Sequence, residues 1–146
     1  MFQLKRIAAL NGVTVTTTSS KFWVGGARRV GIHLRRADHS AGSSAFTVKA
    51  SLEPKEAGNG TPDSYSNRTG GAGVTMTAYN MLIDNVTNTN GQTLTRVNGK
   101  TLAANGDAFL WLDPACLVNW LEITVTETTD GTHSAWIVVE EELPAN

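Results

Sequence analysis

Apolar and polar side chains alternate most regularly in the last part of the chain, over residues 119–142. Leu121, Ile123 and Val125 are separated there by glutamate and threonine, and this two-residue period is typical of a strand with one buried face. A second run of β-branched and aromatic residues follows. The dipeptide between the two runs, Asp130-Gly131, favours a type I′ turn, so residues 119–142 are predicted to form a β-hairpin.

The same alternation separates the two faces of this predicted hairpin. The three apolar residues are expected to anchor the core. Trp120 has the opposite parity, so it is expected to point away from the core and to contact a neighbouring subunit. The glutamates at the strand end, which include Glu140 and Glu141, are expected to be solvated or to pair with arginines of a neighbour.

Shorter apolar or alternating runs occur along the whole chain, separated by Gly, Asn and Pro turn signals. They predict strands at residues 13–18, 22–24, 28–34, 46–52, 74–86, 93–97, 100–104 and 109–112. Many short strands without helical periodicity predict an all-β fold, either a β-sandwich or a barrel. An antiparallel β-sandwich is the architecture that we expect. Among sandwiches, an eight-stranded jelly roll fits the length of the chain best.

The predicted organisation is a single β-sandwich domain over residues 13–146, preceded by residues 1–12 as an N-terminal arm or first strand. One long irregular loop interrupts the domain at about residues 53–73, which are rich in glycine. Loops of this length in compact domains are usually functional or mobile. This loop is therefore expected either to contact another chain, with Tyr65 and Arg68 as candidate residues, or to be mobile.

Composition excludes several classes of protein. Only 17% of the 146 residues are charged and the net charge is −1, so neither nucleic acid nor a membrane is an expected partner. One cysteine, Cys116, excludes an intrachain disulfide. The apolar run at residues 7–10 is too short for a secretory signal, and synthesis in the cytoplasm is expected.

No motif in the sequence carries catalytic or metal chemistry. His33, His39 and His133 have no metal-binding spacing, and no nucleophile elbow of the G-x-S-x-G type is present. An enzyme would need His39 or His133 beside a carboxylate in a cleft. We therefore expect no enzymatic activity, no cofactor and no metal.

Two groups of side chains could instead serve recognition. Arg28, Arg29, Arg35 and Arg36 cluster around one predicted strand, either as a solvated face or as a patch that pairs with acidic groups of a neighbouring protein. The four tryptophans either fill the core or lie exposed as a platform for a partner protein or for sugar rings.

The order of these runs resembles a known group of proteins. Asn-Gly-Val-Thr at 11–14 and Gly-Ala-Arg-Arg-Val at 26–30 precede Phe-Thr-Val-Lys-Ala-Ser-Leu at 46–52. A Gly/Asn-rich middle follows, and then Trp-Leu-Glu-Ile-Thr-Val-Thr-Glu-Thr-Thr-Asp-Gly-Thr at 120–132. Together these runs resemble small jelly-roll structural proteins of tailed bacteriophage virions. In that group such domains decorate or cement the head shell, often as trimers, or form collar and tail parts.

The resemblance implies a capsid decoration or cement subunit that stabilises the shell through protein–protein contacts. It would be made in the host cytoplasm and reside in the virion, bound to itself as a trimer and to the major capsid protein or other virion proteins. The candidate interface residues are Phe2, Leu4, Arg28, Arg29, Arg35, Arg36, Tyr65, Arg68, Trp120, Glu140 and Glu141. The alternatives are a phage collar or tail subunit, or a carbohydrate-binding β-sandwich module that uses Trp23, Trp111 or Tyr65.

Overall fold

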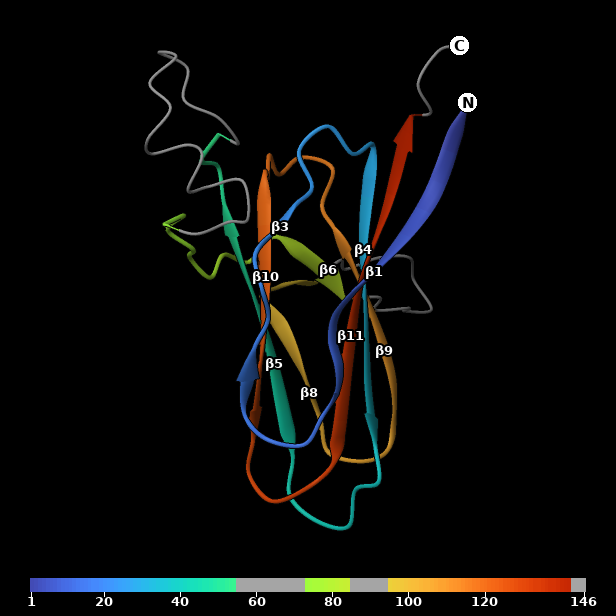
Figure 1. Ribbon diagram of the computed structural model, residues 1–146, viewed down its shortest axis with the longest axis vertical. Coiled ribbons are helices and arrows are strands. Elements are labelled where there is room, and N and C mark those ends of the chain that lie inside the picture. The colour runs from blue at the N-terminus through green and yellow to red at the C-terminus, as the bar shows by residue number, and fades with distance from the viewer. Residues whose placement is uncertain (55–72, 85–94, 143–146) are drawn as a thin grey trace.

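The computed structural model describes residues 1–54, 73–84 and 95–142. They fold into two antiparallel β-sheets packed face to face (Figure 1), and these ranges contain no helix. The strands are β1 (Phe2–Val13), β2 (Thr17–Thr18), β3 (Phe22–Trp23), β4 (Arg29–Ala37), β5 (Ser44–Ser51), β6 (Leu82–Asp84), β7 (Thr95–Val97), β8 (Gly99–Leu102), β9 (Gly106–Leu112), β10 (Trp120–Glu127) and β11 (Thr132–Glu142).

The strand order is that of a jelly roll. The larger sheet has the order β1-β11-β4-β9-β6-β7, and the smaller has β2-β10-β5-β8, with β3 also paired to β10. If β6 and β7 are set aside and β2 and β3 are counted together, the first strand pairs with the last, the second with the second-last, and so on inward. These pairs are β1·β11, β2/β3·β10, β4·β9 and β5·β8. The pairs β11·β4 and β10·β5 then join these hairpin-like ladders into two sheets. The predicted eight-stranded jelly roll is confirmed, with β6 and β7 added at one edge.

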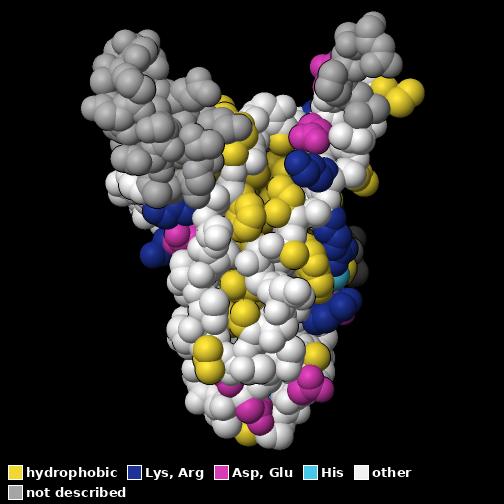
Figure 2. Space-filling view, in the orientation of Figure 1, with side chains coloured by type: hydrophobic (Ala, Val, Ile, Leu, Met, Phe, Trp, Pro, Cys, Tyr) yellow, Lys and Arg dark blue, Asp and Glu magenta, His cyan; other side chains and the backbone are white. Residues whose placement is uncertain are grey.

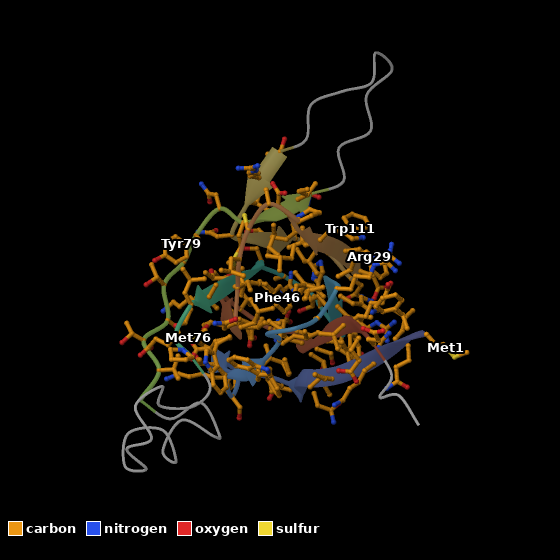
Figure 3. The ribbon with its side chains drawn as sticks, turned by 90° about the horizontal axis from the view of Figure 1, so that it is seen from above. Met1, Arg29, Phe46, Met76, Tyr79 and Trp111 are labelled. Atoms are coloured by element: carbon orange, nitrogen blue, oxygen red, sulfur yellow. The ribbon has the colours of Figure 1, made fainter. Side chains whose placement is uncertain are left out.

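The core lies between the two sheets and is formed by the inward parity of each long strand. Leu121, Ile123 and Val125 are fully buried, as the alternation predicts. Phe46 on β5 pairs with Val125 on β10 and lies between the sheets in Figure 3. Burial of one such side chain contributes about 1.5–3 kcal/mol. The inward faces of β10 and β5 therefore hold the smaller sheet against the larger one.

The predicted hairpin is wrong, because β10 and β11 belong to different sheets. Residues 128–131 cross between the sheets, and Asp130 lacks the positive φ that a type I′ turn requires. Its carboxylate instead accepts hydrogen bonds from the Ser40 hydroxyl and from the Ser40 and Ala41 amides, and these bonds lower the pKa of Asp130 to about 2. A dipeptide specifies a local turn, whereas pairing with β1 and β4 decides which sheet receives β11.

Trp120 is buried within its own chain, so its predicted role at a subunit contact is wrong. It does point away from Leu121, but the neighbouring segments cover it. Its Nε1 donates to the Glu53 carbonyl at 2.9 Å, and the Trp23 ring on β3 packs edge-on against it, with centroids 5.2 Å apart. The side chain is 1% exposed. Strand parity gave its direction correctly, whereas the covering segments come from distant parts of the sequence.

Most of the other predicted strands are present with shifted ends. Residues 2–12, predicted as an arm or first strand, form β1 together with Val13 and pair with β11 in the larger sheet. Of the strand predicted at 13–18, only Thr17–Thr18 form a strand of their own, β2. Of the strand predicted at 74–86, the structure has β6, and Thr77 forms an isolated bridge with Ala50. Most of the predicted irregular loop, residues 55–72, lies outside the described residues.

Arg36 is buried at the end of the sandwich, which corrects its prediction as an interface residue. It has the inward parity of β4, and its side chain is fully enclosed. The guanidinium donates to the backbone carbonyls of Ala41, Gly42, Leu102 and Asp130. These carbonyls belong to the β4–β5 turn, the end of β8 and the β10–β11 crossing, so one side chain ties three connections together.

Replacement of Arg36 by methionine should lower the free energy of unfolding by about 3 kcal/mol or more, because buried carbonyls lose their donor. The matched control is Arg35→Met, since Arg35 is exposed and pairs with Asp107 at 2.8 Å. Loss of that exposed pair should cost less than about 1 kcal/mol. Urea denaturation followed by tryptophan fluorescence measures both variants, and equal losses would contradict the role of Arg36.

Candidate functional site

Beyond the Trp120–Trp23 pair, most outward positions of the smaller sheet are polar. Thr124 and Thr126 on β10 lie beside Thr47 and Ala45 on β5, and Lys49 lies one row further along. Apolar residues inward and polar residues outward are typical of a sheet with one face in water. The smaller sheet thus has the ordinary exterior of a β-sandwich.

The outward positions of the larger sheet are aromatic, apolar and rich in arginine. Cross-strand partners share a face, and the register places these residues in adjacent rows. Leu4, Phe109 and Trp111 are 73%, 54% and 46% exposed, and Arg29 and Trp111 lie on the same side of the molecule in Figure 3. We refer to the following residues as the outer face: Leu4, Arg6, Arg29, Gly31, His33, Arg35, Asp107, Phe109, Trp111, Trp136, Val138 and Glu140.

Gly31 lies in a hollow in the middle of the outer face. It lies between Val138 and Trp111 in its row, and a Cβ at this position would meet the Leu110 carbonyl at an ordinary 3.7 Å. Gly31 is part of the lining of a cavity of about 270 Å³, and this lining also includes Leu4, Arg6, Phe109, Trp111 and Glu140. A large side chain of another molecule could occupy this space.

A chain of polar contacts crosses the outer face. Arg6 Nη2 lies 2.9 Å from His33 Nδ1, and His33 Nε2 lies 2.6 Å from Asp107 Oδ1. Because a guanidinium can only donate, Nδ1 must accept, which assigns the imidazole proton to Nε2, where it is donated to Asp107. The hydrogen bond from His33 lowers the pKa of Asp107, and the hydrogen bond and charge of Arg35 lower it further, against desolvation.

Stacking holds the same groups in place. The His33 ring stacks on Phe109 with centroids 4.4 Å apart, and lies 4.7 Å from the Trp136 ring. Arg6 and Arg35 lie over Trp136, at 4.2 and 5.2 Å from its centroid. Figure 2 shows Lys and Arg side chains gathered down the right-hand side of the molecule, with hydrophobic side chains between them. Side chains that are already held in this way lose little conformational entropy when another molecule binds.

The structure brings part of the predicted interface together. Arg28 and Arg29 both pair with Glu140, and Arg28 Nη1 lies 3.2 Å from Oε1. Arg28 also lies over the Phe2 ring, 4.4 Å from its centroid. Glu140 is therefore buried and neutralised by its own chain, which corrects its predicted role as a group left for a neighbour. Arg35 contributes at the other end of the outer face through Asp107.

The remaining interface candidates lie elsewhere. Glu141 has the opposite parity to Glu140 and accepts a hydrogen bond from Gln3 Nε2 at 3.3 Å. Trp120 and Arg36 are buried, as described above. Tyr65 and Arg68 lie outside the described residues.

Sequence reasoning missed the centre of the outer face, formed by His33, Phe109 and Trp136. A signal for it was present in β9, whose sequence is Gly-Asp-Ala-Phe-Leu-Trp-Leu. Both parities of this strand are apolar from Ala108 onward, although one parity already suffices for a core. A strand that is apolar on both sides indicates either two covered faces or an exposed binding face.

A second polar cluster has the atoms of a nucleophile and a base but no access. Ser44 Oγ lies 2.6 Å from His133 Nε2, and Glu127 Oε2 lies 4.0 Å from His133 Nδ1. Ser44 and His133 are both fully buried, so a substrate could not reach the hydroxyl. His133 Nδ1 also lies 3.0 Å from the Val13 carbonyl, which makes this cluster a link between β1, β5 and β11.

Within the described ranges, no group of three or more His, Cys, Asp or Glu side chains is placed to hold a metal ion. The same part of the chain has no helix of the length and hydrophobicity that crossing a membrane requires. The chemistry that the described side chains support best is recognition of another molecule by the outer face.

Comparison with known proteins identifies a likeness of fold. No family model matches the chain, and no curated protein matches it. Among solved structures, it is similar to the SPBc2 prophage-derived protein YomS, with a TM-score of 0.58. The alignment covers 97% of this chain and 96% of YomS, at 14% sequence identity. The two proteins therefore share the β-sandwich along nearly their whole length.

The hydrogen bond from His33 should be visible in the titration of Asp107. The pKa of Asp107 lies below the usual value of an aspartate. The stabilising contribution of Asp107 is therefore present above the unfolded-state pKa and is lost as the pH falls through the folded-state pKa. His33→Phe keeps the stacked ring but removes the donor, and should raise the pKa of Asp107. Arg35→Met removes the second donor and its charge and should also raise the pKa of Asp107. Carbon-13 NMR of the side-chain carboxylates measures both, and an unchanged pKa in His33→Phe would refute the contact.

Proposed function

We propose that this protein is a structural subunit of a phage particle, a decoration or cement subunit that binds the capsid. The observation that carries the proposal is the outer face, which exposes aromatic and apolar side chains on a sheet that already has a complete core on its other side. The prophage origin of YomS, a protein with the same fold over nearly the whole chain, supports a phage context.

The composition of the outer face is that of a protein-binding surface. Tryptophan, tyrosine and arginine dominate the binding energy of protein interfaces, whereas lysine and glutamate are depleted at their centres. Trp111, Trp136, Arg6 and Arg35 supply these groups, while Glu140 is neutralised by two arginines. A partner surface with an apolar side chain for the hollow and acidic groups for the arginines would complement it.

The mechanism of such a subunit is mechanical. Burial of the outer face on neighbouring shell proteins adds binding free energy that must be lost before the shell can rupture. A specific interface of ordinary size buries about 800 Å² on each partner, an area that several rows of one sheet face can supply. A collar or tail subunit would use the same face, and the particle component that binds it distinguishes these roles.

The outer face can be tested by placing a charge in it. Trp111→Glu should abolish sedimentation of the protein with phage particles, because an unpaired carboxylate would be buried in the contact. Thr126→Glu places the same residue on the exterior of the smaller sheet and should leave binding unchanged. Both variants should keep the wild-type melting temperature within a few degrees. Binding that survives Trp111→Glu, or is lost equally in both variants, would contradict the proposal.

The exposed ring of Trp111 beside the hollow favours carbohydrate binding as a second candidate function, since sugar rings stack on exposed aromatic side chains. A glycan array separates the two candidates. Saturable glycan binding that is lost in Trp111→Ala would support the carbohydrate-binding module, and its absence would leave the structural role.

A further inference from the structure

The outer edge of β1 is long and regular. From Phe2 to Ala8, β1 pairs with β11 without interruption, and its register shifts lie beyond Ala8. It is the edge strand of the larger sheet, and no other described strand pairs with it. In Figure 3, β1 runs along the margin of the molecule to Met1 at its outer end. Within the described residues, the outer side of its backbone is therefore available to a further strand.

The other sheet edges among the described strands are short. At the far side of the larger sheet β7 has three residues, and in the smaller sheet β8 has four and β2 and β3 have two each. Short strands, prolines, bulges and charged side chains are the usual means by which proteins prevent edge-to-edge pairing. The Phe2–Ala8 edge is long and has no proline or bulge. Its charged residues are Lys5 and Arg6, and its Leu4 is 73% exposed.

We propose that this edge pairs with the same edge of a second copy, as two antiparallel β1 strands related by a two-fold axis at Leu4. The axis places Leu4 opposite Leu4 of the second copy. Phe2 then faces Arg6 of the second copy, and Gln3 faces its Lys5. The pairing joins the two larger sheets into one continuous sheet and keeps both outer faces on the same side.

The sequence of β1 disfavours registers centred beyond Leu4. An axis at Lys5 or at Arg6 would set like charges directly opposite each other, which destabilises a strand pair. An axis at Ile7 would carry the pairing past Ala8 into the register shift. With the axis at Leu4, this leucine faces Leu4 of the second copy, and Phe2 faces Arg6 of the second copy.

Contacts between arginine and aromatic side chains already occur in this part of the chain. Arg28 lies 4.4 Å from the Phe2 centroid, and Arg6 lies 4.2 Å from the Trp136 centroid. In the two-fold pair, Phe2 lies opposite Arg6 of the second copy. The guanidinium of each Arg6 stays on the His33 and Trp136 of its own copy, so the aliphatic stem of Arg6 is the part that would pack against Phe2. A partner strand with acidic residues is not needed for complementarity, because the segment from Phe2 to Arg6 already complements itself. This property favours a second copy as the occupant.

The inference does not depend on the proposed function, but it specifies how two outer faces would be arranged when the protein binds a particle. A two-fold contact uses the same patch on both subunits, so it predicts a dimer, where the resemblance to phage decoration proteins implies a trimer. Two outer faces on one side would bind a repeating surface with higher avidity than one face alone.

Disulfide trapping tests the register. In a Cys116→Ala background, Leu4→Cys places two thiols opposite each other at a strand-pair separation, which a disulfide can bridge. Mild oxidation should yield a covalent dimer at least about tenfold faster than for Leu117→Cys, because pairing raises the local thiol concentration. Leu117 is a suitable control because it is 78% exposed and lies outside β1. Equal rates for the two variants would overturn the inference.

Sedimentation velocity provides the second measurement and needs no cysteine. The wild-type chain should sediment as a dimer, and Leu4→Glu should raise its dissociation constant by about tenfold or more, because two carboxylates would face each other. Leu117→Glu and Trp111→Glu should remain dimeric. A wild-type monomer, or a dimer that Leu4→Glu leaves intact, would overturn the inference.

The outcomes separate this inference from the proposed function. A protein that is a dimer but binds no phage particle would support the β1 contact and contradict the capsid role. A protein that is a monomer but binds particles through Trp111 would contradict the β1 contact and support the capsid role.

Discussion

The structure depends on the burial of one parity of side chains from both sheets in a single shared core. Leu121, Ile123 and Val125 from the smaller sheet and Ile137 from the larger are all fully enclosed there. Each of the strands that carry them is the central partner of others, since β10 joins β5 to β2 and β3, and β11 joins β1 to β4. Placing β10 and β11 in opposite sheets is what allows both to be central. The crossing at residues 128–131 is therefore a requirement of the fold.

Because the inward side chains of both sheets complete the core, the outward side of each sheet can have a different composition. The smaller sheet carries threonine and lysine outward. The larger sheet carries Trp111, Phe109 and Trp136, with arginines stacked on them and the Gly31 hollow among them. None of these side chains is needed to hold the two sheets together, so their presence requires another explanation. Contact with a second molecule explains both the exposed rings and the network that fixes their positions.

The sequence predicted the parts of the structure that depend on local periodicity. The sandwich and the buried parity of β10 follow from alternation and turn spacing, and the jelly roll was expected from the length of the chain. The errors arose where distant segments decide the outcome. Asp130-Gly131 predicted a hairpin because the signal is local, whereas pairing with β1 and β4 recruits β11 to the other sheet. Trp120 and Arg36 were predicted to be exposed because the segments that cover them come from residues far away in the sequence. The centre of the outer face escaped prediction because its rows cross four strands that are not consecutive.

The most direct test of the outer face as an interface is hydroxyl-radical footprinting of the protein, free in solution and bound to assembled phage particles. Tyr79 is the internal reference, because it is 54% exposed and lies on the other side of the molecule (Figure 3). The outer-face interface predicts that Trp111 and Phe109 lose reactivity on the particle while Tyr79 retains it. Protection of Tyr79 with unchanged reactivity at Trp111 and Phe109 would contradict the assignment.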